Sequence, residues 1–179
     1  MTEPTQLQCA CGQVRLDVEG APIVSVECCC NSCRAAAARL QTDPGAPSIA
    51  DSKGATRFVL YRKDRIRFVQ GVDQLKEFRL TPDAKTRRVL ATCCKAPVFL
   101  EFENGHWLSL YGALFPADKL PPLEMRTMTA DLPAGTPLPQ DVPNGKRQPL
   151  SFMIKLLGAW IAMHFRSPKV DIGSGVIHV

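Results

Sequence analysis

The stretch Cys28-Cys29-Cys30-Asn31-Ser32-Cys33 holds four cysteines in six positions, which is half of the eight cysteines in the chain. The other four form two further clusters, one at Cys9-Ala10-Cys11-Gly12 and one at Cys93-Cys94. Clustered thiolates at such short spacings are typical of metal sites. We therefore expect the three clusters to gather around metal, with zinc as the expected ion, and the rest of the chain to hold them together.

The spacing of the cysteines predicts how they share ions. In an extended strand, residues i and i+2 point to the same face, so Cys28 and Cys30 can bind one ion, and Cys9 and Cys11 another. The spacing from Cys30 to Cys33 is that of a turn which brings the second thiolate back to the same ion. Three thiolates leave one of the roughly four positions of zinc free, as in catalytic sites. We predict that Cys28, Cys30 and Cys33 are catalytic metal ligands.

Disulfides, redox thiols and iron–sulfur clusters are alternatives to zinc. The N-terminal residues Met-Thr-Glu-Pro-Thr-Gln lack the basic region and apolar run of a secretory signal, so we expect a cytoplasmic protein. In a reducing compartment, clustered cysteines are more often metal ligands than disulfides. Thiolates suit iron–sulfur clusters as well as zinc, and the sequence leaves that choice open.

Composition and charge narrow the class of protein. The 179 residues are 45% hydrophobic and 22% charged, as in a globular domain. The net charge of +5 is small and gives no strong nucleic-acid signal. No apolar run reaches the length of about 18 residues that is needed to span a membrane.

Short runs of β-forming residues separated by turn signals predict a mainly β fold, a sandwich or open barrel of antiparallel sheets. Residues 7–18 read as a hairpin. Further strands are expected at 23–28, 57–61, 65–69, 75–80, 88–91, 97–102 and 107–111. After Cys33, a run of alanines predicts a short helix.

We divide the chain into a zinc-binding β domain at residues 5–118, a proline-rich irregular segment at 119–150 and a C-terminal helix at 151–167. Ser151 is the expected helix cap, and Pro168 is expected to end the helix. This helix is apolar nearly all round but too short to span a membrane. It could dock on its own domain, on a second subunit or on a membrane surface.

The motifs Cys9-x-Cys11-Gly12 and Cys28-x-Cys30-x-x-Cys33-Arg34, followed by a cysteine pair before Pro97, resemble the glutathione-dependent formaldehyde-activating enzyme family, also called centromere protein V-like. The resemblance covers roughly residues 5–115. It implies a β-tent fold with two zinc sites. Cys28, Cys30 and Cys33 would form the open site, and Cys9, Cys11 and Cys94 would belong to the closed, structural one.

The third motif departs from the family pattern, in which Cys-x-x-Cys-Gly precedes the proline. Counted back from Pro97, Cys94 falls on the second expected cysteine, Ala91 on the first and Lys95 on the glycine. Three outcomes are open for the closed site. Cys93 substitutes through a kinked backbone, another ligand joins three thiolates, or the site is empty. We therefore expect one or two Zn²⁺ ions per chain in a divergent relative of the family.

The resemblance implies a carbon–sulfur lyase acting on an adduct of glutathione, or another small thiol, with an aldehyde. Six arginines between residues 57 and 88 could receive the carboxylates of glutathione; they are Arg57, Arg62, Arg65, Arg67, Arg87 and Arg88. Histidines are few, with His106 the first candidate for acid–base work, ahead of His164 and His178. The alternatives are a non-catalytic zinc-stabilised binding module and a thiol redox or metal-handling protein that uses Cys29 and Cys93 as spare thiols.

Overall fold

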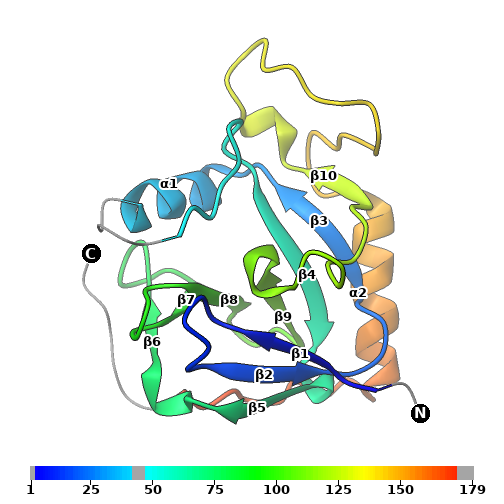
Figure 1. Ribbon diagram of the computed structural model, residues 1–179. Coiled ribbons are helices and arrows are strands. Elements are labelled where there is room, and N and C mark those ends of the chain that lie inside the picture. Colours follow the sequence, from blue (N-terminus) through cyan, green and yellow to red (C-terminus); the bar gives the residue numbers. More distant parts are fainter. Residues whose placement is uncertain (1–2, 42–46, 173–179) are drawn as a thin grey trace.

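The structure, a computed structural model, describes residues 3–41 and 47–172 (Figure 1). Its larger sheet has seven strands in the order β10-β3-β4-β9-β8-β7-β6. Their bounds are β3 Val24–Cys28, β4 Thr56–Arg62, β6 Leu75–Phe78, β7 Thr86–Ala91, β8 Pro97–Phe102, β9 Trp107–Tyr111 and β10 Met125–Thr127. Neighbouring strands are antiparallel except β10, which runs parallel to β3.

A second sheet of three strands, in the order β1-β2-β5, packs on one face of the larger sheet. Its strands are β1 Thr5–Gln8, β2 Arg15–Val18 and β5 Ile66–Gln70. The core between the two sheets joins side chains such as Leu7 and Leu16 of the small sheet to Val89, Val98 and Leu108 of the large one. All five side chains are fully buried. This core fixes the two sheets, and therefore the hairpin turns at their ends, relative to each other.

Two helices, α1 Asn31–Leu40 and α2 Leu150–Ala162, pack against a second core on the other face of the large sheet. Figure 1 shows α1 and α2 at different edges of the fold. The alternation of side chains along β7 separates the two cores. Val89 and Ala91 belong to the core between the sheets, whereas Leu90 belongs to the core under the helices. Arg88, two residues before Leu90, lies on this helix side and is only 1% exposed.

The predicted fold class, mainly β with a C-terminal helix, is confirmed, and each predicted strand corresponds to one of β1 to β9. The helix ends were predicted wrongly. Pro149, rather than Ser151, is the cap residue of α2, and it makes no side-chain cap. The helix also stops at Ala162, before Pro168, because His164 and Phe165 adopt left-handed backbone angles with φ of 51° and 58°.

The proposed division into segments 5–118, 119–150 and 151–167 stays a prediction. The middle segment nevertheless contributes β10 to the large sheet, and its Arg126 binds Glu27 on β3 at 2.7 Å.

Neither helix in the described part of the chain has the length and apolar character that a membrane span requires.

Gly71 provides a test of how tightly the small sheet is built. It has φ of +75°, and a Cβ atom there would lie 2.4 Å from the carbonyl oxygen of Gln13. We expect Gly71→Ala to lower the free energy of unfolding by about 3 kcal/mol or more, since the left-handed angle alone costs about 1–2 kcal/mol and the clash adds to it. Gly135→Ala is the control, because Gly135 has φ of +79° with nothing within 4 Å. Equal losses in urea unfolding would contradict the clash.

Candidate metal centres

The structure brings Cys9, Cys11, Cys93 and Cys94 together in one group, the four-cysteine cluster. All four sulfur atoms lie within 4.8 Å of one another. The Sγ atoms of Cys11 and Cys93 are 3.3 Å apart, those of Cys9 and Cys11 3.6 Å, those of Cys9 and Cys93 3.8 Å, and those of Cys93 and Cys94 4.0 Å. A tetrahedral zinc ion with Zn–S bonds near 2.3 Å separates its sulfurs by about 3.8 Å. The spacing therefore fits a tetrahedral, closed metal site.

Two tight turns build the four-cysteine cluster. In the β1–β2 turn, the N–H of Gly12 donates to the carbonyl of Cys9, and Gly12 takes the left-handed φ of 76° that this turn requires. The N–H of Val14 donates to Cys9 Sγ at 3.3 Å. Although burial opposes ionisation, this bond and others from Cys11 lower the pKa of Cys9 to about 7. The turn thus presents a thiolate that is ready for a cation.

The β7–β8 turn supplies the other two cysteines and favours one of the three outcomes left open by the sequence. Ala91 is fully buried in β7, and its N–H donates to the carbonyl of Ala96. Cys93 and Cys94 both lie in the turn between these residues and both join the cluster. Lys95 takes the left-handed φ of 58° at the position where the family has glycine. The geometry therefore corresponds to substitution by Cys93, with four thiols and no missing ligand.

The second group, the three-cysteine cluster, consists of Cys28, Cys30 and Cys33, whose sulfur atoms also lie within 4.8 Å of one another. Cys28 ends β3, Cys30 caps α1, and Cys33 lies in the first turn of α1. The N–H of Cys33 donates to Cys30 Sγ at 3.3 Å. Three thiols with no fourth described ligand are the arrangement of an open metal site.

Ionisation in the three-cysteine cluster is centred on Cys30. Hydrogen bonds from the thiols of Cys28 and Cys33, joined by the backbone N–H groups of Cys33 and Ser32, lower the pKa of Cys30 to about 2. The position at the N-terminus of α1 acts in the same direction, because the free N–H groups of a helix start favour negative charge. The first turn of α1 contains no acidic residue that would compete.

Cys29 points away from the three-cysteine cluster, because neighbouring residues of an extended chain face opposite sides. It is fully buried against Ala55 and Leu132, and burial raises its pKa to about 11. A buried thiol with a raised pKa is a poor nucleophile. Since Cys93 has joined the four-cysteine cluster, the geometry gives no support to these two residues as spare redox thiols.

Arg88 is a buried cation beside the three-cysteine cluster. Its Nη2 donates to the carbonyl and hydroxyl oxygens of Ser32, at 3.1 and 3.0 Å, in the first turn of α1 between Cys30 and Cys33. Its Nε and Nη1 atoms are buried and have no hydrogen-bond partner among the described residues. Because buried donors without a partner are costly, these two nitrogen atoms make Arg88 a group suited to bind an anion.

Tyr111 connects Arg88 with the cysteines. Burial raises the pKa of Tyr111, the guanidinium of Arg88 acts against this rise, and the thiols of Cys33 and Cys28 add to it. The hydroxyl therefore stays protonated between a cation and a group of thiolates. Sequence patterns do not distinguish this residue, because a tyrosine at the end of a β-strand is usually an ordinary core residue.

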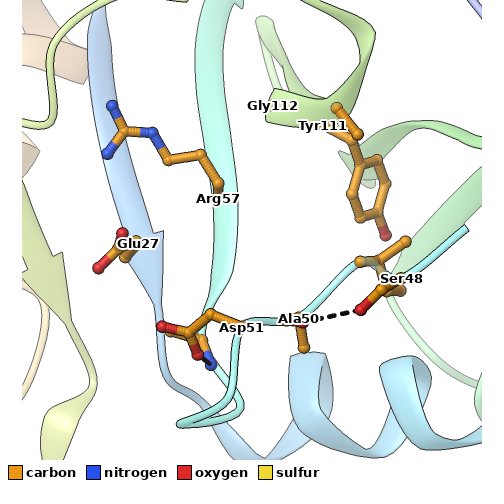
Figure 2. A pocket seen from close by; sticks show the side chains of 10 residues that line it. Glu27, Ser48, Ala50, Asp51, Arg57, Tyr111 and Gly112 are labelled. Carbon is orange, nitrogen blue, oxygen red and sulfur yellow. Dashed lines mark hydrogen bonds between the residues drawn. The ribbon is translucent and has the colours of Figure 1, made fainter. Parts of the chain in front are cut away.

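The ring of Tyr111 also lines a cavity of about 240 Å³ that Figure 2 shows from close by. Arg57, Glu27 and Asp51 line the cavity and give it charges of both signs. Burial lowers the pKa of Arg57, and its Nε atom has no hydrogen-bond partner. Gly112 is needed at this point, since a Cβ atom there would lie 2.6 Å from Cγ of Arg57. The cavity thus offers sites for a carboxylate and an ammonium group.

Most of the other arginines that the sequence analysis named as candidates to bind glutathione already form ion pairs with Asp or Glu. Arg62 binds Asp64, Arg67 binds Asp17, and Arg87 binds Glu101 and Glu77. Among the described residues, Arg57 and Arg88 are the two of these six arginines that have buried side-chain nitrogen atoms without a hydrogen-bond partner.

The histidines take no part in either cluster within the described residues. The Nε2 atom of His106 lies 2.9 Å from the carbonyl of Leu156, and its ring stacks on Trp160. It therefore attaches α2 to the β8–β9 turn. His164 is exposed beyond the end of α2, and His178 lies outside the described residues.

Comparison with known proteins adds two findings. The model of the family "glutathione-dependent formaldehyde-activating enzyme" matches residues 4–46. A crystal structure of a Rhodobacter sphaeroides protein superposes with a TM-score of 0.46 and 15% sequence identity, over 78% of this chain and 99% of that one. No curated protein sequence matches the chain. The resemblance to the glutathione-dependent formaldehyde-activating enzyme family is thereby confirmed over residues 4–46, the segment that holds two of the three cysteine motifs.

Proposed function

We propose that each cysteine cluster binds one zinc ion and that the protein catalyses the reversible addition of a small thiol, glutathione in the first instance, to formaldehyde or a similar aldehyde. The observation that carries this proposal is the three-cysteine cluster with Arg88 beside it, a cation with two free donors. The family match over the same cysteines supports it. The four-cysteine cluster is assigned a structural ion, because its own thiols can fill a tetrahedron.

The reaction forms a carbon–sulfur bond between the thiol and the carbonyl carbon, breaks the carbonyl π bond, and moves the thiol proton to the oxygen. Zinc bound to the three-cysteine cluster would supply Lewis acidity at its free position. Arg88 would donate from Nε and Nη1 to the oxygen, on which negative charge develops. The same groups would serve the reverse, lyase direction.

The cavity beside Tyr111 is proposed to hold the γ-glutamyl end of glutathione, which carries a carboxylate and an ammonium group. Arg57 suits the carboxylate and Asp51 suits the ammonium, whereas Glu27 already pairs with Arg126. The volume of about 240 Å³ lies below the usual range for a whole drug-sized ligand, so one end of the tripeptide is the expected occupant.

Exchange NMR with ¹³C-formaldehyde and glutathione tests the proposal, because it measures adduct formation above the spontaneous rate. The native protein is expected to accelerate exchange, and Cys30→Ser to lose the acceleration. Cys29→Ser is the matched control, since Cys29 is next in sequence but turned into a separate apolar cluster. A protein that holds two zinc ions but leaves exchange at background would refute the enzymatic proposal and favour a zinc-stabilised binding module.

A further inference from the structure

The outer face of α2 and the residues just after it form an exposed apolar surface. Seven of the nine large hydrophobic side chains that are exposed among the described residues lie between positions 150 and 165. They are Leu150, Met153, Ile154, Leu157, Trp160, Ile161 and Phe165. An eighth, Phe102, lies next to them on the β8–β9 hairpin. Contiguous exposed apolar surface of this kind marks an interaction site.

The inward face of α2 is firmly attached, so the exposed face is a fixed feature of the fold. Phe152 and Leu156 are buried in the core under the helices. The bond between His106 and the carbonyl of Leu156 holds the middle of the helix, and Lys155 binds Glu124 at 2.5 Å. Figure 1 shows α2 along one edge of the molecule, on the side opposite α1.

A groove of about 620 Å³ runs between α2 and the β8–β9 turn. Apolar side chains make up most of its walls, among them Phe102, Trp107, Ile154, Leu157 and Trp160. Glu103 at the hairpin tip is the acidic residue that lines it. The groove extends the apolar surface inward and has room for part of an acyl chain.

The positive charge of the segment around α2 favours an anionic partner. Residues 144–170 contain five of the 22 Lys and Arg of the chain, namely Lys146, Arg147, Lys155, Arg166 and Lys169, and none of its 17 Asp and Glu. The remainder therefore carries 17 of each sign, and the whole net charge of +5 belongs to this segment. All five basic residues are exposed. Lys155, in the middle of the helix, pairs with Glu124, and the other four stand near its two ends.

We propose that α2 binds the surface of an anionic membrane, with its apolar outer face in the boundary between headgroups and acyl chains. An apolar helix face flanked by Lys and Arg is the pattern of helices that lie in this interface. Basic residues at the membrane surface add about 1 kcal/mol each on anionic lipid, or about fivefold in affinity. A second copy of the chain would instead bring two segments of the same positive charge together.

Sedimentation with vesicles tests this proposal on the full chain loaded with zinc. We expect binding to phosphatidylcholine vesicles that contain about 30% phosphatidylserine, and much weaker binding to phosphatidylcholine alone. The double variant Ile154→Ser with Leu157→Ser is expected to bind at least about a hundredfold more weakly, because two apolar side chains that would enter the membrane interface are lost. Val69→Ser is the matched control, since Val69 is 50% exposed but lies on β5.

A second variant separates charge from apolar contact. Replacing Arg166 and Lys169 by Gln leaves the core under the helices unchanged and should weaken binding to anionic vesicles about 25-fold. Equal binding to neutral and anionic vesicles, or no binding to either, would overturn the proposal. So would self-association that Ile154→Ser with Leu157→Ser abolishes, since it would assign the face to a second copy. Zinc content and aldehyde exchange in the same samples report on the proposed function independently.

Discussion

Replacing Cys11 by Ser is expected to remove one zinc ion per chain and to lower the free energy of unfolding by several kcal/mol. The four-cysteine cluster joins the β1–β2 turn of the small sheet to the β7–β8 turn of the large sheet, across more than 80 residues of sequence. An ion at this point links the two sheets, and its binding free energy becomes folding free energy. Cys11 is exposed, so the substitution itself creates no cavity.

Cys30→Ser provides the contrast for this prediction. The three-cysteine cluster lies within six residues of sequence, so its ion closes no long loop. We expect Cys30→Ser to lose its own zinc and the aldehyde exchange while keeping most of the stability. Elemental analysis gives the zinc content, and urea unfolding gives the stability. If Cys11→Ser left two zinc ions in place, or if both variants were destabilised equally, the assignment of a structural and an open site would be wrong.

Local sequence patterns predicted the elements of the fold because they act over a few residues. The i, i+2 spacing of Cys28 and Cys30 placed both thiols on one side of β3, and the same rule turned Cys29 away. The outcome at Cys93 depended on the turn between Ala91 and Ala96 and on the left-handed angle at Lys95. Such a backbone angle is unusual for lysine, and sequence alone favoured glycine there.

The role of Arg88 could not be separated from that of the other arginines by sequence reasoning. It was named only as one of six arginines between residues 57 and 88 that could bind the carboxylates of glutathione. Its position two residues before Leu90 carries the signal, since both side chains share the buried face of β7. Tyr111 and the cavity could not be predicted, because they depend on the pairing of β4 with β9, which joins residues about 50 positions apart.

Arg88→Met is expected to slow aldehyde exchange by about 10² to 10³-fold while leaving the unfolding free energy unchanged or raised. Loss of one preorganised donor to a developing oxyanion typically costs this factor in rate. The fold, however, gains from the change, because a buried cation with two unpartnered nitrogen atoms is replaced by an apolar side chain of similar length. Functional sites whose residues lower stability show this pattern when they are mutated, in which activity falls while stability is kept or rises.

Arg87→Met is the matched control, since Arg87 precedes Arg88 in β7 and faces away from the cysteines. It forms ion pairs with Glu101 at 2.6 Å and Glu77 at 3.3 Å, so its loss should lower stability and leave exchange unchanged. Exchange NMR, urea unfolding and zinc content are measured for both variants. Arg88→Lys keeps the charge but lacks the forked donors, and should recover only part of the rate. A native rate in Arg88→Met, with lowered stability, would make Arg88 a purely structural residue that holds the start of α1 at Ser32.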